Sequence, residues 1–489
     1  MFLGIDLGTS AVKINLVDEH QRVVASADRA LHPVQPRPLW SEDDPESWWT
    51  AVADGLDQLA AEHPAAMAAV AGIGLSGQMH GALLLDGEDR PVRPAILWND
   101  GRAAAEAAEL AGLGEAVQAE MGVLAMPGFA GPKILWLAKH EPETIRRARH
   151  LLLPKDFIRL KLCGERATDV TDAGGAWLLD EANRRWSPTA LGACGVDPAW
   201  LPRLVESREP TGTLRPEIAA RWGMGTGVVV AGGAGDATAG GIGIGSVHEG
   251  DGFLSLGTSA QIFAAAAAHR PDPGRMVHAF CHAVPGMWCR IAALLNGASP
   301  LAAAARWTGN AEIGVLLAEA EARFKGPSRL LALPYLFGER TPHNDPHALG
   351  AIVGLTASTH RADLIQAVLE GVAFSLVDGL DTLAASGTRF ERLAFIGGGT
   401  RSPFWARIIA SAMGVALVKY DASDRGPAFG AARLARLAAT GEPVADVVVA
   451  PPVQSVIEPD PTLHEAYKPR IEAFRSLYRA LKPEFARGT

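Results

Sequence analysis

Residues 228–245 read VVVAGGAGDATAGGIGIG, an apolar run that leads into a glycine-rich loop. The three valines predict a buried strand, because β-branched side chains suit a pleated layer that is closed to water. The glycines let the backbone turn tightly and approach a ligand closely. Asp236 is the single ionisable residue among them, which makes it a candidate general base. The alternative is structural: Asp236 could be the N-cap of a helix that continues over residues 238–244.

A short motif occurs twice, once near the start of each half of the chain. Residues 5–10 read IDLGTS and residues 254–259 read LSLGTS, and each copy follows an apolar strand pattern. A turn of small hydroxylated residues between two strands can surround phosphate oxygens with backbone N–H groups. Two such turns facing each other would hold the phosphates of a nucleotide from both sides. Asp6 could bind Mg²⁺ through water, whereas its counterpart Ser255 could not replace it, and an ordinary β-hairpin is the alternative for either copy.

Two further strand ends carry side chains that suit a sugar. One predicted strand leads to Met79 and His80, and the next ends at Trp98 and Asn99. An aromatic face next to an amide group offers contacts to sugar C–H groups and hydrogen bonds to hydroxyls. His80 could equally be a loop histidine with a structural partner.

Glycines mark two other segments. Residues 397–400, GGGT, precede a predicted helix and would let a flat base or ribose lie against the backbone, with a plain tight turn as the alternative. Residues 425–439 predict a helix of small residues that can pack closely beside this loop. Residues 72–77 fit G-x-G-x-x-G, but no clear helix follows them, so we discount dinucleotide binding.

Composition narrows the class of protein. A chain of 489 residues with 48% hydrophobic and 20% charged residues predicts a globular protein of more than one domain. The formal net charge of −9 argues against nucleic-acid binding, and there is no apolar run of membrane-spanning length or signal peptide. The alternate spacing of His343, Asp345 and His347 is poor zinc geometry. We therefore expect a cytoplasmic protein whose partners are small molecules, with a homodimer as its assembly. Its cysteines show no CxxC spacing and read as reduced thiols: Cys163, Cys194, Cys281 and Cys289.

Taken together, the motifs resemble those of the FGGY carbohydrate kinases, a family within the actin, hexokinase and heat-shock-chaperone superfamily. The resemblance runs in order from about residue 2 to residue 485. It is carried by GIDLGTS, PLWSEDDPESWW, GQMHGALLLD, RPAILWNDGR, LLLPKDFIRL, LSLGTS, LPYLFGERTPHNDP and IGGGTRS. It implies an α/β fold of two actin/hexokinase-like (ribonuclease H-like) domains with a cleft between them. We expect residues 1–246 to bind the sugar and supply the catalytic base, and residues 247–489 to bind ATP.

The resemblance also implies a role for each candidate residue. Asp236 matches the general base, and Asp6 is the expected Mg²⁺ ligand. The expected sugar contacts are Met79, His80, Trp98, Asn99 and Asp236. The expected ATP-binding residues are Gly8, Thr9, Ser10, Lys13, Gly257, Thr258, Ser259, Gly297, Gly398, Gly399 and Thr400.

Within this family the motifs are most similar to those of bacterial enzymes that act on xylulose. This similarity implies ATP-dependent phosphorylation of D-xylulose to D-xylulose 5-phosphate. A kinase for another ketose or polyol, such as ribulose, arabinitol or glycerol, is the first alternative, although GQMHG favours xylulose over glycerol. A non-catalytic ATP-driven clamp is the second. Ala237 stands where family members commonly carry Asn or Gln, which leaves the substrate preference open.

Overall fold

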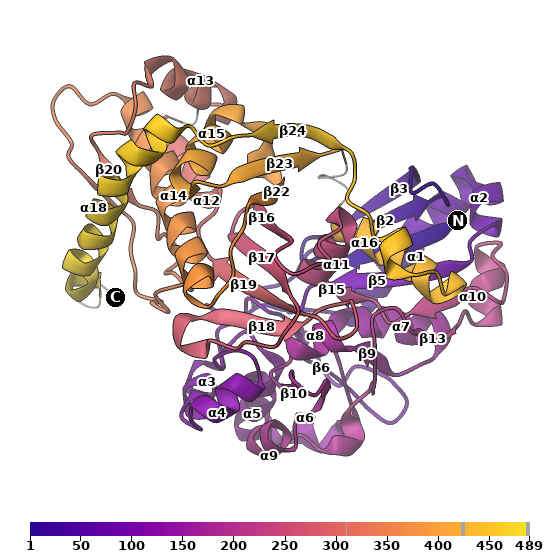
Figure 1. The fold of residues 1–489 in the computed structure, drawn as a ribbon. Coiled ribbons are helices and arrows are strands. Elements are labelled where there is room, and N and C mark those ends of the chain that lie inside the picture. Colours follow the sequence, from indigo (N-terminus) through magenta and orange to yellow (C-terminus); the bar gives the residue numbers. More distant parts are fainter. Residues whose placement is uncertain (310, 422–425, 486–489) are drawn as a thin grey trace.

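The computed structural model describes residues 1–309, 311–421 and 426–485. Figure 1 shows two α/β halves, the first with its sheet beside the N-terminus and the second carrying the long C-terminal helix. Arg425, the first residue of the helix predicted over 425–439, lies outside the described residues.

Each half is built on a mixed sheet of seven strands. The first sheet has the order β13 (Pro210–Thr213), β14 (Val229–Ala231), β5 (Gly72–Gly77), β1 (Phe2–Leu7), β2 (Ala11–Val17) and β3 (Val23–Ala30), with β15 (Ala234–Gly235) paired to β5. The second has the order β18 (Val277–Cys281), β19 (Trp288–Leu294), β17 (Ala260–Ala266), β16 (Gly252–Leu256), β22 (Arg392–Ile396), β23 (Ala416–Tyr420) and β24 (Val453–Ile457).

The two sheets repeat one topology. In the first, β3, β2 and β1 are antiparallel neighbours, β5 and β14 continue in parallel from β1, and β13 closes the edge antiparallel. In the second, β19, β17, β16, β22, β23 and β24 take the same places with the same directions, and β18 is added outside β19. The twice-occurring LGTS motif therefore lies at equivalent hairpin turns of two equivalent sheets.

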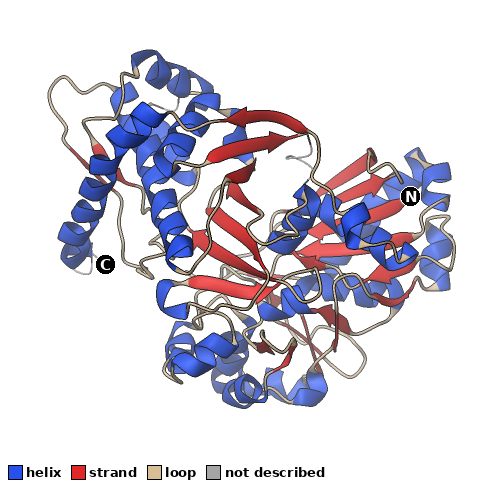
Figure 2. Cartoon of the chain, in the orientation of Figure 1, coloured by secondary structure: helices blue, strands red, loops and turns tan. Residues whose placement is uncertain are grey.

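Helices cover both faces of each sheet (Figure 2). The first half contains α1 (Pro45–Glu62), α2 (Pro64–Ala68), α3 (Ala104–Ala111), α4 (Glu115–Glu120), α5 (Ala130–His140), α6 (Pro142–Arg147), α7 (Pro154–Cys163), α8 (Val170–Gly174), α9 (Pro188–Cys194), α10 (Pro216–Arg221) and α11 (Asp236–Ile244). The second contains α12 (Ser299–Trp307), α13 (Ile313–Arg323), α14 (Arg361–Ala385), α15 (Pro403–Met413), α16 (Gly426–Thr440), α17 (Val444–Val447) and α18 (Pro461–Phe485). The short 3-10 helices are η1 (Pro198–Trp200), η2 (Pro273–Arg275) and η3 (Gly398–Arg401).

Small two-stranded sheets complete the fold. They are formed by β4 (Glu42–Asp43) with β7 (Ala95–Ile96), β6 (Leu83–Leu85) with β8 (His150–Leu152), β9 (Ala167–Asp169) with β12 (Arg203–Val205), β10 (Leu179–Asp180) with β11 (Arg185–Trp186), and β20 (Leu331–Leu333) with β21 (Ala351–Val353). No helix in the described parts of the chain is long and apolar enough to cross a membrane.

Local sequence explains the main elements. The Asp44 side chain caps α1 by accepting from the backbone N–H of Glu46 at 3.1 Å, and Pro45 occupies the first helical position. Trp48 of α1 is fully buried and belongs to the hydrophobic core of the first sheet. In the second half α14 is buried along most of its length and joins α15 and α18 in one core.

Helix α16 belongs to the second half in sequence but packs against the first sheet (Figure 1). This contact needs glycine, since a Cβ atom at Gly4 would overlap the Ala428 carbonyl and one at Gly74 would overlap that of Ala431. A Cβ atom at Gly430 would likewise overlap the Ala239 carbonyl of α11. The glycines of residues 72–77 lie within strand β5, where they allow α16 to pack closely. This position in a strand agrees with our decision to discount a dinucleotide-binding motif. The first residues of α16, Gly426 and Pro427, line one cavity together with Gly397, Gly398 and Thr400 of the loop beside which we expect this helix to pack.

Candidate active site

Two cavities meet at Asp236 in the cleft between the sheets. The first has a volume of about 410 Å³ and the second about 290 Å³. Both are lined by Asp236, Ala237, Ser255 and Gln261. A molecule in one cavity can therefore contact a molecule in the other beside the Asp236 carboxylate.

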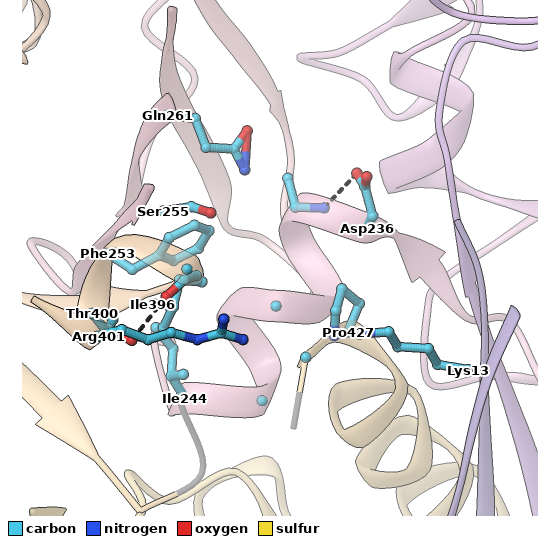
Figure 3. A pocket seen from close by; sticks show the side chains of 16 residues that line it. Lys13, Asp236, Ile244, Phe253, Ser255, Gln261, Ile396, Thr400, Arg401 and Pro427 are labelled. Carbon is cyan, nitrogen blue, oxygen red and sulfur yellow. Dashed lines mark hydrogen bonds between the residues drawn. The ribbon is translucent and has the colours of Figure 1, made fainter. Parts of the chain in front are cut away.

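The first cavity, drawn in Figure 3, suits a nucleotide. Ile244, Phe253 and Ile396 form an apolar part of its wall, and Phe253 stacks on Phe263 behind it. The backbone of Gly397 and Gly398 forms a polar part, where the Thr400 hydroxyl donates to the Gly397 carbonyl at 2.8 Å. Figure 3 shows two cationic side chains, Lys13 and Arg401, entering from opposite sides. This combination offers stacking surface to a base and positive charge to phosphates.

Asp236 is the first residue of α11, and Gly235 occupies the N-cap position that the structural alternative gave to Asp236. Its carboxylate accepts a hydrogen bond from the backbone N–H of Ala237 at 2.7 Å. The Asp236 side chain is exposed to the cleft by its surface area, although the atoms of both halves surround its carboxylate closely enough to reduce its hydration. This burial raises the pKa of Asp236 from 3.8 to about 6, against the opposing effect of the Ala237 N–H. A carboxylate with that pKa is a stronger proton acceptor than an ordinary aspartate.

Asp6, the penultimate residue of β1, lies close enough to Asp236 to feel its charge. It is buried, and its Oδ1 atom has no hydrogen-bond partner among the described residues. Burial, followed by the negative charge of Asp236, raises the pKa of Asp6 to about 7. An unsatisfied, buried carboxylate oxygen beside a second carboxylate fits a hard divalent cation, which prefers oxygen ligands.

The second cavity contains Met79, His80 and Trp98. His80 has a left-handed backbone (φ 69°), and its Nδ1 lies 2.7 Å from the Gly175 carbonyl. Burial, together with nearby cations, lowers the pKa of His80 to about 3, so the ring is neutral. Because a carbonyl can only accept, the Nδ1 atom carries the proton and Nε2 is left as an acceptor. The Trp98 indole donates to the Thr9 hydroxyl at 2.8 Å, which fixes the ring at the cavity wall.

The remaining predicted residues take different places around these cavities. Gly257 and Ser259 line the second cavity, and Lys13, Gly398 and Thr400 line the first. Gly297 supports the second hairpin turn, because its N–H donates to the Thr258 carbonyl at 3.0 Å and a Cβ atom would overlap the Ser259 carbonyl. The predicted residues that line neither of these two cavities are Asp6, Gly8, Thr9, Ser10, Asn99, Thr258, Gly297 and Gly399. Asn99 lies on an exposed turn.

Sequence reasoning missed four residues. Lys133, from the start of α5, is buried and donates to the His80 carbonyl at 2.9 Å. Gln261, His278 and Arg340 line the second cavity. Arg340 lies in the GERTPH segment. In the sequence this segment contributes to the family resemblance, and its only residues considered as ligands are the candidates for metal binding. Within that segment His343 stacks on Tyr478 and lies 3.0 Å from the Tyr335 hydroxyl, which gives it a packing role.

Comparison with known proteins identifies the family. Residues 1–243 match the N-terminal domain of the FGGY family of carbohydrate kinases, and residues 252–439 match its C-terminal domain. The chain belongs to the FGGY family of carbohydrate kinases. It is therefore an ATP-dependent sugar kinase, and the predicted two-domain actin/hexokinase-like fold is confirmed.

Individual FGGY relatives align with almost the whole chain. The xylulose kinase of Escherichia coli (strain K12) is 44% identical over 99% of this chain and 100% of the relative. The xylulose kinase of Klebsiella pneumoniae is 43% identical over 99% of both chains. A solved structure described as a xyloylose kinase from Brucella ovis superposes with a TM-score of 0.96 at 45% identity, covering 99% of each chain.

Proposed function

We propose that this enzyme transfers the γ-phosphoryl group of MgATP to the C5 hydroxyl of D-xylulose, giving D-xylulose 5-phosphate and ADP. The observation that carries the proposal is the meeting of a nucleotide-sized cavity and a sugar-sized cavity at Asp236. The choice of xylulose is supported by relatives named for that substrate over the full chain length.

In this proposal Asp236 is the general base. The C5 hydroxyl lies at the junction and gives its proton to the Asp236 carboxylate as its oxygen attacks the γ-phosphorus. The bond between that phosphorus and the bridging oxygen of ADP breaks in the same displacement. The pKa of about 6 keeps most of the carboxylate ionised near neutral pH while leaving it basic enough to accept the proton.

Asp6 is the proposed protein ligand of Mg²⁺, directly or through water. When bound, the ion neutralises charge on the β- and γ-phosphates. The buried Oδ1 atom of Asp6, which lacks a partner among the described residues, supports this assignment.

The nucleotide would occupy the first cavity. Adenosine would lie against Gly398, Gly399 and Thr400, and Lys13 would face the phosphates. The hairpin turns over residues 8–10 and 257–259 would surround the phosphates with backbone N–H groups, braced on one side by Gly297.

The sugar would occupy the second cavity, against Met79, His80 and Trp98. The Nε2 atom of His80 would accept a hydrogen bond from a sugar hydroxyl, since Nδ1 is engaged with Gly175. Asn99 would join these contacts only when the cleft closes over its turn. We assign the base and these sugar contacts to a domain of residues 1–246, and most of the adenosine contacts to residues 247–489.

The test is an assay of ATP consumption with D-xylulose, D-ribulose, D-arabinitol and glycerol, with each product identified by mass spectrometry and NMR. Xylulose should give the highest kcat/KM and a 5-phosphate. A higher value with another ketose or polyol would overturn the choice of substrate. ATP hydrolysis without any phosphorylated sugar would favour an ATP-driven clamp. Light scattering on the same preparation would test the expected homodimer.

A further inference from the structure

Arg340 is a cation of the sugar cavity that no role described above uses. It lines the second cavity together with His80 and His278, and it does not line the first. Its charge lowers the pKa of both His80 and His278, whereas the pKa of Asp236 is set by burial and by the Ala237 N–H. Arg340, His80 and His278 thus share the second cavity, and none of the three lines the first.

The loop that carries Arg340 is held firmly on both sides. Glu339 is buried and accepts from the backbone N–H groups of Leu295 at 2.7 Å and of Arg340 itself at 2.8 Å. Thr341 is fully buried; its N–H donates to the Ala293 carbonyl at 3.1 Å and its hydroxyl to the Met276 carbonyl at 2.9 Å. The backbone of Arg340 is thus fixed in place before any ligand arrives.

The side chain, in contrast, has no acceptor within the part of the protein that the structure describes. Among the described residues, no carboxylate lies within ion-pair distance of the Arg340 guanidinium, and its N–H groups donate to no oxygen. The neighbouring histidines are neutral, because burial lowers their pKa values, and the buried Nε2 atom of His278 has no partner in residues 1–309, 311–421 and 426–485. Arg340 is half-buried and its nitrogen atoms are not among the buried ones that lack a partner, so its N–H groups reach solvent and are free to donate to an acceptor that a ligand supplies.

The Arg340 guanidinium and the His80 imidazole differ in the hydrogen bonds that they can make. A guanidinium has five N–H donors and cannot accept, whereas the His80 Nε2 atom can only accept. In an open-chain ketose, the hydroxyls can satisfy an acceptor, and the C2 carbonyl oxygen is the one group that can never donate. With C5 held at Asp236, C2 lies three carbons away, at the end of the cavity where Arg340 and the histidines are found.

We propose that Arg340 recognises the ketose carbonyl. Its guanidinium donates hydrogen bonds to the C2 oxygen and so favours ketoses over polyols. This inference rests on the proposed function, since it assumes that an open-chain ketose is phosphorylated at its far end. A polyol carries a C2 hydroxyl whose hydrogen must be turned away from the guanidinium, so it is the poorer partner.

The experiment compares kcat/KM for D-xylulose with that for xylitol and D-arabinitol, the two polyols formed by reducing xylulose at C2. In Arg340→Met the value of kcat/KM for xylulose should fall by about 100-fold, and the values for the polyols by ten-fold or less. The difference arises because only xylulose has a C2 carbonyl oxygen, and the substitution removes the charged donor of its hydrogen bonds. Arg340→Lys keeps the charge and a donor, should give an intermediate ratio, and serves as the test when the Met variant does not fold.

Arg401→Met is the matched control, since it removes a cation from the first cavity. It should raise the KM for ATP and leave the ratio of xylulose to polyol unchanged. Equal losses with xylulose and the polyols in folded Arg340 variants would overturn the role of Arg340 alone. An unsubstituted enzyme that phosphorylates polyols but no ketose would overturn the proposed function and this inference together.

Discussion

The hydroxyl of Thr171 accepts a hydrogen bond from the backbone N–H of Gly235, over 2.9 Å, one residue before Asp236. The same hydroxyl donates to Asp169 at 2.6 Å. Asp169 in turn contacts the ammonium of Lys155 at 2.8 Å, inside a fully buried cluster with Asp156 and Asp172. The backbone that presents the base is therefore tied to a buried ionic cluster of the first half.

Replacement of Thr171 by Val should weaken this link. The substitution removes the acceptor of the Gly235 N–H and one of the hydrogen bonds that Asp169 accepts, so we expect a loss of about 1–3 kcal/mol in the free energy of unfolding and a lower kcat. Denaturant unfolding and steady-state kinetics measure the two effects. Thr171→Ser keeps the hydroxyl and should behave like the unsubstituted enzyme. A Val variant with normal kcat would show that Thr171 does not position the base.

Replacement of Asp236 by Asn should remove proton transfer and leave binding largely intact. We expect kcat to fall by roughly 10²- to 10⁴-fold, the usual contribution of a positioned general base. Calorimetric titration should still detect ATP and xylulose. Asp54→Asn, on the exposed side of α1, removes an equal charge far from the cleft and controls for a general effect. Near-normal turnover in a folded Asp236→Asn enzyme would disprove the role.

The pH dependence should follow from the same carboxylate. Burial raises the pKa of Asp236 from 3.8 to about 6, and only the ionised form accepts a proton. As pH falls below 6, the ionised fraction and kcat/KM should fall together, by roughly ten-fold between pH 7.5 and pH 5. The assay uses saturating Mg²⁺ and ATP, so that metal binding at Asp6 does not limit the rate. A profile that stays flat down to pH 5 would show that the base has an ordinary pKa.

Ala237 offers a change in specificity. It lines both cavities and has no polar side-chain atom, so it cannot hydrogen-bond a hydroxyl near the attacking end of the sugar. Ala237→Asn should sharpen the preference for xylulose over ribulose and xylitol, because a polar group left unpaired by the wrong isomer is costly. The ratios of kcat/KM for the three sugars measure this preference. Unchanged ratios in a well-folded variant would mean that this position does not contact the sugar.

Local patterns predicted those parts of the fold that depend on nearby residues. The strand and turn that lead to Asp236 and the two LGTS hairpins follow from residue type and short spacing. The family resemblance supplied the two-domain arrangement, which these local patterns alone left open.

The parts that could not be predicted depend on distant segments meeting. Gly74 is glycine because Ala431 of α16 lies against it, and nothing near residue 74 indicates that partner. Lys133 supports the His80 backbone, and Arg340 lines the sugar cavity, only because α5 and a loop of the second half come together around this cavity. Asn99 shows a similar limit: it follows Trp98 in sequence but lies on an exposed turn and does not line the second cavity, so its contact with the sugar stays a prediction.

The glycine-lined contact with α16 also affects how the chain folds during synthesis. Domains generally fold as they emerge from the ribosome, N-terminal first. The face of the first sheet around Gly4 and Gly74 receives its cover only once residues 426–440 have been made. Until then the nascent first half carries an uncovered patch of β1 and β5. We therefore expect residues 1–246 expressed alone to aggregate or bind chaperones, and co-expression with residues 247–489 to restore them.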